Sequence, residues 1–157
     1  MSLISTFLRK WRALWRYGWQ ERLLLIPVFC LLGLARAMVL CLAFRRYVWI
    51  FGQRSSDDTP LLNSKQQKRT RVIGNTIRMV AKVTPWQSVC LPQAICACVL
   101  LRIYRVPFKV RFGVMPNENP DLSDPLLAHV WVKAGPNIPT GAEEHEKYTV
   151  VAKFCHA

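Results

Sequence analysis

The spacing of apolar positions predicts an amphipathic helix near the start of the chain. Between residues 4 and 19, large apolar side chains recur every three or four residues, and basic side chains occupy positions between them. This period matches the turn of an α-helix. The apolar positions are Ile4, Phe7, Leu8, Trp11, Leu14, Trp15 and Trp19.

Residues 23–44 form an almost continuous apolar stretch that carries Pro27, Gly33 and Arg36. The stretch is long enough to span a bilayer. The cost of an arginine at the bilayer centre, about 2.5–3.5 kcal/mol, can be offset by many leucines. We favour the alternative in which Arg36 divides the stretch into two helices that pack on a core. A membrane span is the second interpretation.

A polar, turn-forming segment separates this apolar region from the rest of the chain. Residues 53–64 have the composition of a linker, so we expect an N-terminal helical region over residues 1–52 and a core over residues 65–157. Ser64 is placed to cap a helix from Lys65 to Lys82. One side of that helix is apolar and the other is basic. The basic side either receives an acidic partner surface or is solvated.

The last part of the chain changes from helical to alternating patterns. Residues 90–104 form a compact apolar helix that Pro107 ends. Apolar and polar residues then alternate over 108–112 and over 129–133, which predicts two half-buried strands. β-Branched and aromatic residues over 148–154 predict a last strand. The sequence therefore predicts an α+β fold in which helices precede a small antiparallel sheet.

The length and composition indicate one globular domain, with or without an additional segment. It has 157 residues, of which 52% are apolar, and a net charge of +13. Residues 1–83 carry fifteen basic and three acidic side chains, whereas residues 84–157 carry seven and six. A basic half with interleaved large aliphatic residues favours an anionic lipid surface or a peptide over nucleic acid, for which no motif is visible. A multidomain machine, a disordered chain and a fibrous repeat are excluded.

The six cysteines indicate neither a metal site nor a disulfide framework. They stand at 30, 41, 90, 96, 98 and 155 without a Cys-x-x-Cys pair, and no histidine pair has zinc-finger spacing. Tryptophans and basic residues precede the apolar stretch, and no cleavage site closes it, which argues against a secretory signal. We therefore expect a reduced, cytoplasmic protein, either free or held at the inner face of the membrane by its apolar stretch.

One cysteine and one histidine stand out as a candidate catalytic pair. Cys90 begins the predicted helix, where the positive end of the helix dipole favours a thiolate. His129 is the one histidine inside a strand pattern. A helix packed on the sheet can bring thiol and imidazole within hydrogen-bond reach, as nucleophilic catalysis requires. A lone cysteine with a distant histidine is more often structural, so spacing alone does not assign the role.

Longer sequence words around these two residues resemble the transglutaminase-like leader peptidases of lasso peptide biosynthesis. The words are Pro-Trp-Gln-Ser-Val-Cys-Leu-Pro-Gln-Ala at 85–94, Pro-Phe-Lys-Val-Arg-Phe-Gly-Val at 107–114 and Ala-His-Val-Trp-Val at 128–132. Segments 19–25 and 148–154 look like that family too, so the similarity extends from about residue 8 to residue 154. The Cys-Leu and His-x-Trp-Val words are specific in combination.

The resemblance implies a papain-like core without cofactor or metal, in which Cys90 attacks the scissile amide of a ribosomally made precursor peptide. His129 then acts as general base and acid. Oxyanion donors would be helix N-terminal amides, with the Gln87 side chain. The implied partners are a small leader-recognition protein and an ATP-dependent cyclase, which closes the macrolactam after leader removal. Trp86 and Trp131 either line a peptide groove or pack in the core.

The chain departs from this family at the third catalytic position. The family's acidic residue, twelve positions after the histidine, falls at Gly141. Glu143, Asp121, Asp124 or a backbone group could orient the imidazole instead. Because the carboxylate is missing, one alternative function is a non-catalytic leader-binding module of the same fold. The apolar stretch 23–44 and its basic flanks motivate another, a membrane-associated scaffold, which can coexist with peptidase activity.

Overall fold

The computed structural model describes residues 18–54, 61–117 and 125–157, so the helix predicted for residues 4–19 lies almost entirely outside them. The helices are α2 (Trp19–Cys41), α3 (Ser64–Ala81) and α4 (Cys90–Ile103), with short 3-10 helices η1 (Phe44–Arg46), η2 (Val48–Phe51) and η3 (His145–Lys147). The strands are β1 (Gln53–Arg54), β2 (Phe108–Pro116), β3 (Leu126–Ala134), β4 (Asn137–Thr140) and β5 (Thr149–His156).

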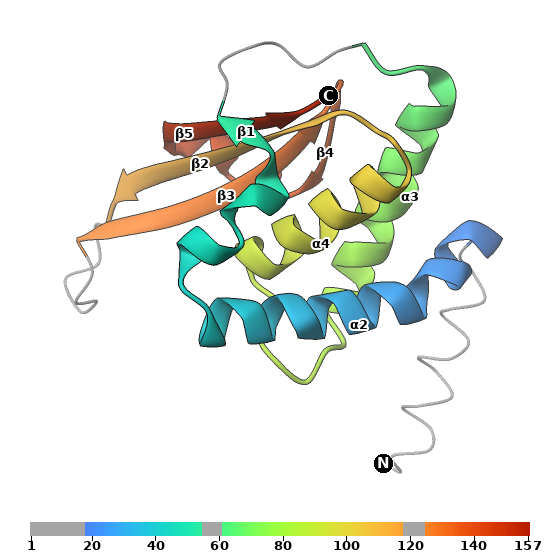
Figure 1. Ribbon diagram of the computed structural model, residues 1–157, viewed down its shortest axis with the longest axis horizontal. Coiled ribbons are helices and arrows are strands. Elements are labelled where there is room, and N and C mark those ends of the chain that lie inside the picture. The colour runs from blue at the N-terminus through green and yellow to red at the C-terminus, as the bar shows by residue number, and fades with distance from the viewer. Residues whose placement is uncertain (1–17, 55–60, 118–124) are drawn as a thin grey trace.

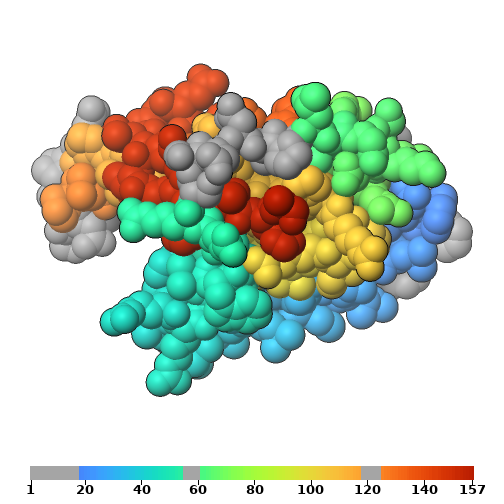
Figure 2. All heavy atoms as spheres, turned by 45° about the horizontal axis from the view of Figure 1, so that its top comes forward, coloured from blue at the N-terminus to red at the C-terminus, as the bar shows by residue number. Residues whose placement is uncertain are grey.

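The described strands form one antiparallel sheet in the order β1-β5-β2-β3-β4. β2 is the central strand, and its Val110 and Phe112 lie opposite Val132 and Val130 of β3. The end of β5 lies beside β1 and near α4 (Figure 2). The predicted α+β fold, with helices followed by a small antiparallel sheet, is confirmed. The edge strands β1 and β4 are too short to show a sequence pattern.

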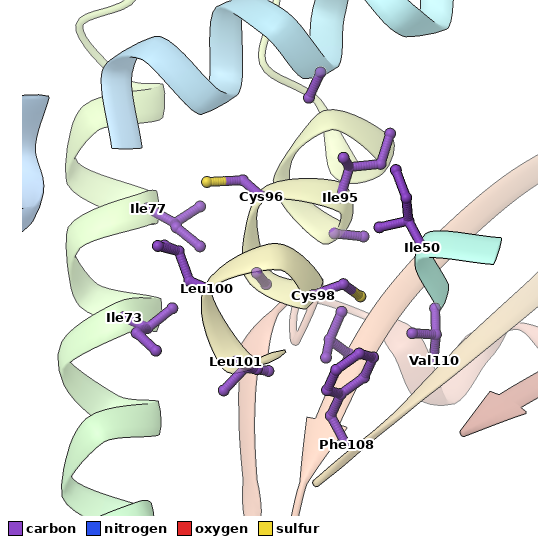
Figure 3. Close-up of a cluster of buried hydrophobic side chains, with 14 of the residues drawn as sticks. Ile50, Ile73, Ile77, Ile95, Cys96, Cys98, Leu100, Leu101, Phe108 and Val110 are labelled. Atoms are coloured by element: carbon purple, nitrogen blue, oxygen red, sulfur yellow. The ribbon is translucent and has the colours of Figure 1, made fainter. Parts of the chain in front are cut away.

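α4 lies at the centre of the fold, between the sheet and α2 (Figure 1). Figure 3 shows Ile73 and Ile77 of α3 beside it, and Phe108 and Val110 of β2 on another side. Eight of its fourteen residues are buried, among them Cys98. Because α4 is enclosed in this way, the position of its first residue relative to the sheet is fixed.

α2 is one continuous helix, so the division of residues 23–44 into two helices at Arg36 is wrong. The buried side chains Leu24, Val28, Leu32 and Ala35 form one stripe along the helix. Arg36 lies beside this stripe and is half-buried. Its long side chain can therefore keep its charge in water while its backbone continues the helix.

α3 begins with a different cap from the one predicted. Asn63, not Ser64, is the N-cap residue: its Oδ1 accepts a hydrogen bond from the Gln66 amide at 2.8 Å. Gln66 Oε1 accepts one from the Asn63 amide at 3.1 Å, which completes a capping box. Buried side chains from before and after the expected linker belong to one apolar cluster. The division into two domains at residues 53–64 stays a prediction.

Candidate active site

Cys90 is the first residue of α4, as the sequence predicts. Val89 is the N-cap residue and makes no side-chain hydrogen bond to the helix. The amides of Cys90 and Leu91 have no acceptor within the helix, and Pro92 has no N–H. The half-buried thiol therefore lies beside two backbone donors at the positive end of the helix dipole.

The turn that precedes the thiol is held by hydrogen bonds and by one aromatic side chain. Thr84 Oγ1 lies 2.9 Å from Ser88 Oγ. Gln93, one turn into α4, donates Nε2 to the Ser88 carbonyl oxygen at 2.7 Å. Trp86 packs against α2, with its ring 5.0 Å from that of Phe29. Of the two roles open to Trp86, the structure shows packing, which ties the turn to α2.

His129 lies on β3, opposite Gly113 of β2. Its aromatic neighbours are Trp131, with ring centroids 5.9 Å apart, and Tyr148, at 5.0 Å. Trp131 is only 2% exposed, so it packs and does not line a groove. His129 Nε2 lies 3.0 Å from the carbonyl oxygen of Gly141. When Nε2–H is donated to that carbonyl, Nδ1 is the nitrogen left to accept a proton.

Gly141 has a conformation that no side chain tolerates well. Its φ is +71°, in the left-handed region that favours glycine. A Cβ at this position would meet the carbonyl oxygen of Val130 and lie 2.8 Å from Cα of Trp131. The backbone that directs a carbonyl at His129 therefore excludes an aspartate here. Among those acceptors left open by the sequence that the structure describes, a backbone group is the one in contact with the imidazole.

The thiol and the imidazole line the same open cavity, which has a volume of about 700 Å³. Its walls come from the end of α3, the start of α4, β3 and the segment after β4. Glu143 lies on the wall, whereas Asp121 and Asp124 fall outside the described residues. Within the part of the chain that is described, no hydrogen bond joins Cys90 to His129. Catalytic hydrogen bonds often tighten only when substrate binds.

Three polar residues that line the cavity were not predicted from the sequence to belong to the site. Gln87 is exposed and does not line the cavity, but Gln93 does. A signal for Gln93 exists in the sequence, since a residue three positions after the thiol lies on the same helix face. Arg78 and Lys82 also line the cavity and make one wall of it basic. Because Arg78 and Lys82 are four residues apart in a predicted helix, the sequence also contains the signal that they lie on the same face.

The other thiols of α4 differ from Cys90 in burial, and this predicts a labelling pattern. Burial raises the pKa of the Cys96 thiol to about 12, and burial also raises the pKa of Cys98. At pH 8, iodoacetamide should therefore alkylate Cys90 and the exposed Cys30 in the folded protein and spare Cys96 and Cys98. Peptide mass spectrometry measures the pattern, and the spared thiols should react after unfolding. Rapid labelling of Cys96 in the folded protein would contradict the packing of α4.

Comparison with known proteins identifies one family. A family model described as the transglutaminase-like superfamily matches residues 38–153. No curated protein and no solved structure gives a match. The matched residues include Cys90, His129 and Gly141, whereas most of α2 precedes them.

Proposed function

Because the chain belongs to the transglutaminase-like superfamily, we propose that it is a cysteine peptidase that removes the leader from a ribosomally made lasso peptide precursor. The fold of this superfamily commonly carries cysteine protease or acyl-transfer chemistry. The observation that supports peptidase activity is the cavity shared by Cys90 and His129, whose imidazole has an acceptor in place. The sequence words at 85–94 and 128–132 support the precursor as substrate.

In the proposed reaction, Cys90 Sγ attacks the carbonyl carbon of the scissile amide while His129 Nδ1 takes the thiol proton. The imidazolium then gives this proton to the leaving amine, and the C–N bond breaks. The leader remains on Cys90 as a thioester. Water, deprotonated by His129, attacks the thioester and releases the leader as a carboxylic acid, which restores the thiol.

The oxyanion of each tetrahedral intermediate needs hydrogen-bond donors that are already in place. The amides at the start of α4 fit this requirement, since Val89 provides no side-chain cap that competes for them. The Gln93 side chain is a poorer candidate because its amide already donates to the Ser88 carbonyl oxygen. Gln93 instead supports the turn that orients the thiol.

The Gly141 carbonyl takes the place of the family's carboxylate in this scheme. It fixes the tautomer and the orientation of His129, which is the positioning role of the family's third catalytic residue. A carbonyl dipole stabilises the imidazolium less than a full negative charge does. The arrangement therefore supports catalysis. It gives His129 an acceptor in place of the missing acidic residue, whose absence motivated the binding-module alternative.

Replacing Gly141 by alanine should damage this arrangement. The left-handed φ costs an alanine about 1–2 kcal/mol, and the new Cβ pushes against the backbone of β3. We expect kcat for leader removal to fall by about tenfold or more. Gly135→Ala is the matched control, because Gly135 also has a positive φ but lies outside the cavity. Equal kcat values for both variants in a cleavage assay would show that the Gly141 carbonyl does not position His129.

The proposed substrate and partners follow from the resemblance and from the charge of the cavity. Arg78 and Lys82 form a basic wall beside the thiol, which favours acidic side chains or carboxylate groups of a bound peptide. A small leader-recognition protein would deliver the precursor, and an ATP-dependent cyclase would receive the free core peptide. We place these reactions in the cytoplasm, where precursor and cyclase meet.

The proposal is tested by incubating the precursor encoded beside this gene with the protein and its leader-recognition partner. Mass spectrometry should detect a leader fragment and a free core peptide. Their two masses should add up to the mass of the precursor plus one water. A precursor with a scrambled leader is the control and should stay intact. If leader binding is measurable but the precursor is never cleaved, the protein is a leader-binding module instead.

A further inference from the structure

α2 has two apolar faces, and among the described residues only one of these faces packs against the rest of the protein. Its inner stripe of Leu24, Val28, Leu32 and Ala35 contacts α3 and α4. On the opposite side, Leu23 is 67% and Ile26 is 76% exposed. The same outer face carries Trp19, Cys30, Leu34, Ala37 and Cys41, all of them exposed. A helix that is apolar all round, yet half uncovered, indicates a second apolar environment.

The outer face is free of charge along its length and bordered by arginines. From Leu23 to Cys41 the helix carries a single ionisable group besides its thiols, Arg36, at the margin of the inner stripe. Arg22 lies near one end, and the exposed Arg45 and Arg46 follow the other. Over residues 18–54, Glu21 is the one acidic side chain. The border therefore attracts an anionic surface.

The length of α2 would also allow it to cross a membrane, but its packing argues against this. Its 23 residues are long and apolar enough for a span. In the structure, however, α2 forms the layer that covers α4 on the side away from the sheet (Figure 1). A spanning α2 would leave α4 and α3, and their buried side chains, such as Ile77 and Cys96, would lose their cover.

We propose that the outer face of α2 lies flat on an anionic membrane surface while its inner stripe stays in the core. The apolar side chains would enter the boundary between headgroups and acyl chains, and the arginines would contact lipid phosphates. A second copy of the chain is a poor occupant, because it would bring the same arginines, with a net charge of +13 per chain, against this face.

Vesicle flotation with the full-length protein tests the proposal. The probes are vesicles of phosphatidylcholine alone and vesicles that also contain phosphatidylglycerol. We expect binding to the anionic vesicles at about 0.1 M salt, a severalfold loss of binding at about 1 M salt, and release by alkaline carbonate. If the protein binds neither kind of vesicle, the proposal is overturned and a protein partner on this face is favoured. Binding that resists carbonate would overturn it in favour of a span.

Surface variants separate α2 from other contributions to binding. The double substitution Leu23→Glu with Ile26→Glu adds charge to exposed positions and should weaken anionic-vesicle binding by about tenfold or more. Val151→Glu, on the exposed side of β5, is the matched control and should bind as the wild type does. Circular dichroism verifies that each variant is folded. If the folded double variant binds as well as the control, α2 does not mediate the binding.

Discussion

Replacing Cys90 by alanine should lower the rate of leader removal by at least about a thousandfold. The substitution removes the sulfur that attacks the amide, and the serine hydroxyl that lines the same cavity, Ser88 Oγ, is hydrogen-bonded to Thr84. Stability should change little, because the side chain is small and only half-buried at the helix start. The measurement is a timed cleavage assay with product masses.

The matched control for this variant is Cys30→Ala. Cys30 is an exposed thiol on α2, so its loss removes a cysteine without touching the cavity. Cys30→Ala should cleave at the wild-type rate, and Cys90→Ala should still bind the leader. Wild-type cleavage by Cys90→Ala would reject the nucleophile that we assign.

The second large effect is expected for His129→Ala. Without the imidazole, the thiol has no base, and the leaving amine has no acid, so kcat should fall by at least about a thousandfold. The measurement is the timed cleavage assay with product masses, run on both proteins under the same conditions.

His145→Ala is the control for His129. His145 is half-buried, with its ring 5.6 Å from that of Trp131, and its Nδ1 lies 2.7 Å from the Ala142 carbonyl oxygen. It does not line the cavity. We expect His145→Ala to keep activity within a few-fold of wild type. If instead His145→Ala is inactive and His129→Ala is active, the general base has been assigned to the wrong histidine.

The elements that carry the site were predictable because each has a regular local pattern. The apolar run of residues 90–104 predicted α4 nearly as it is, and the alternation over 108–112 and 129–133 predicted parts of β2 and β3, which extend over 108–116 and 126–134. Cys90 and His129 follow from these elements, since one begins a helix and the other lies within a strand. Sequence words then selected this pair among six cysteines and three histidines.

The acceptor for His129 was not predictable in the same way. Sequence comparison looks for a carboxylate, whereas the structure uses a carbonyl group, which every residue has. Only the positive φ of Gly141 and its close approach to Trp131 reveal why that residue is a glycine. The packing of Trp131 and Tyr148 beside the imidazole likewise depends on the strand register, which sequence alone leaves undetermined.

The continuity of α2 was missed for a different reason. A charged residue need not interrupt a helix in an apolar run, because its long side chain can reach water, and Arg36 lies beside the buried face. Periodicity could not identify the inner stripe, because the outer face of α2 is equally apolar. Under our proposal, the outer face of α2 is apolar because it contacts a membrane surface, not because it packs in the core.

The most direct test of the central claim is covalent capture of the thiol by a substrate-like probe. A leader peptide that ends in a chloromethyl ketone at the scissile position is incubated with the protein and its leader-recognition partner, and the modified residue is mapped by tandem mass spectrometry. We predict one adduct, on Cys90, formed much more slowly in His129→Ala. A probe that binds but modifies another cysteine, or leaves Cys90 free, would contradict the assignment of Cys90 and His129 as the catalytic pair.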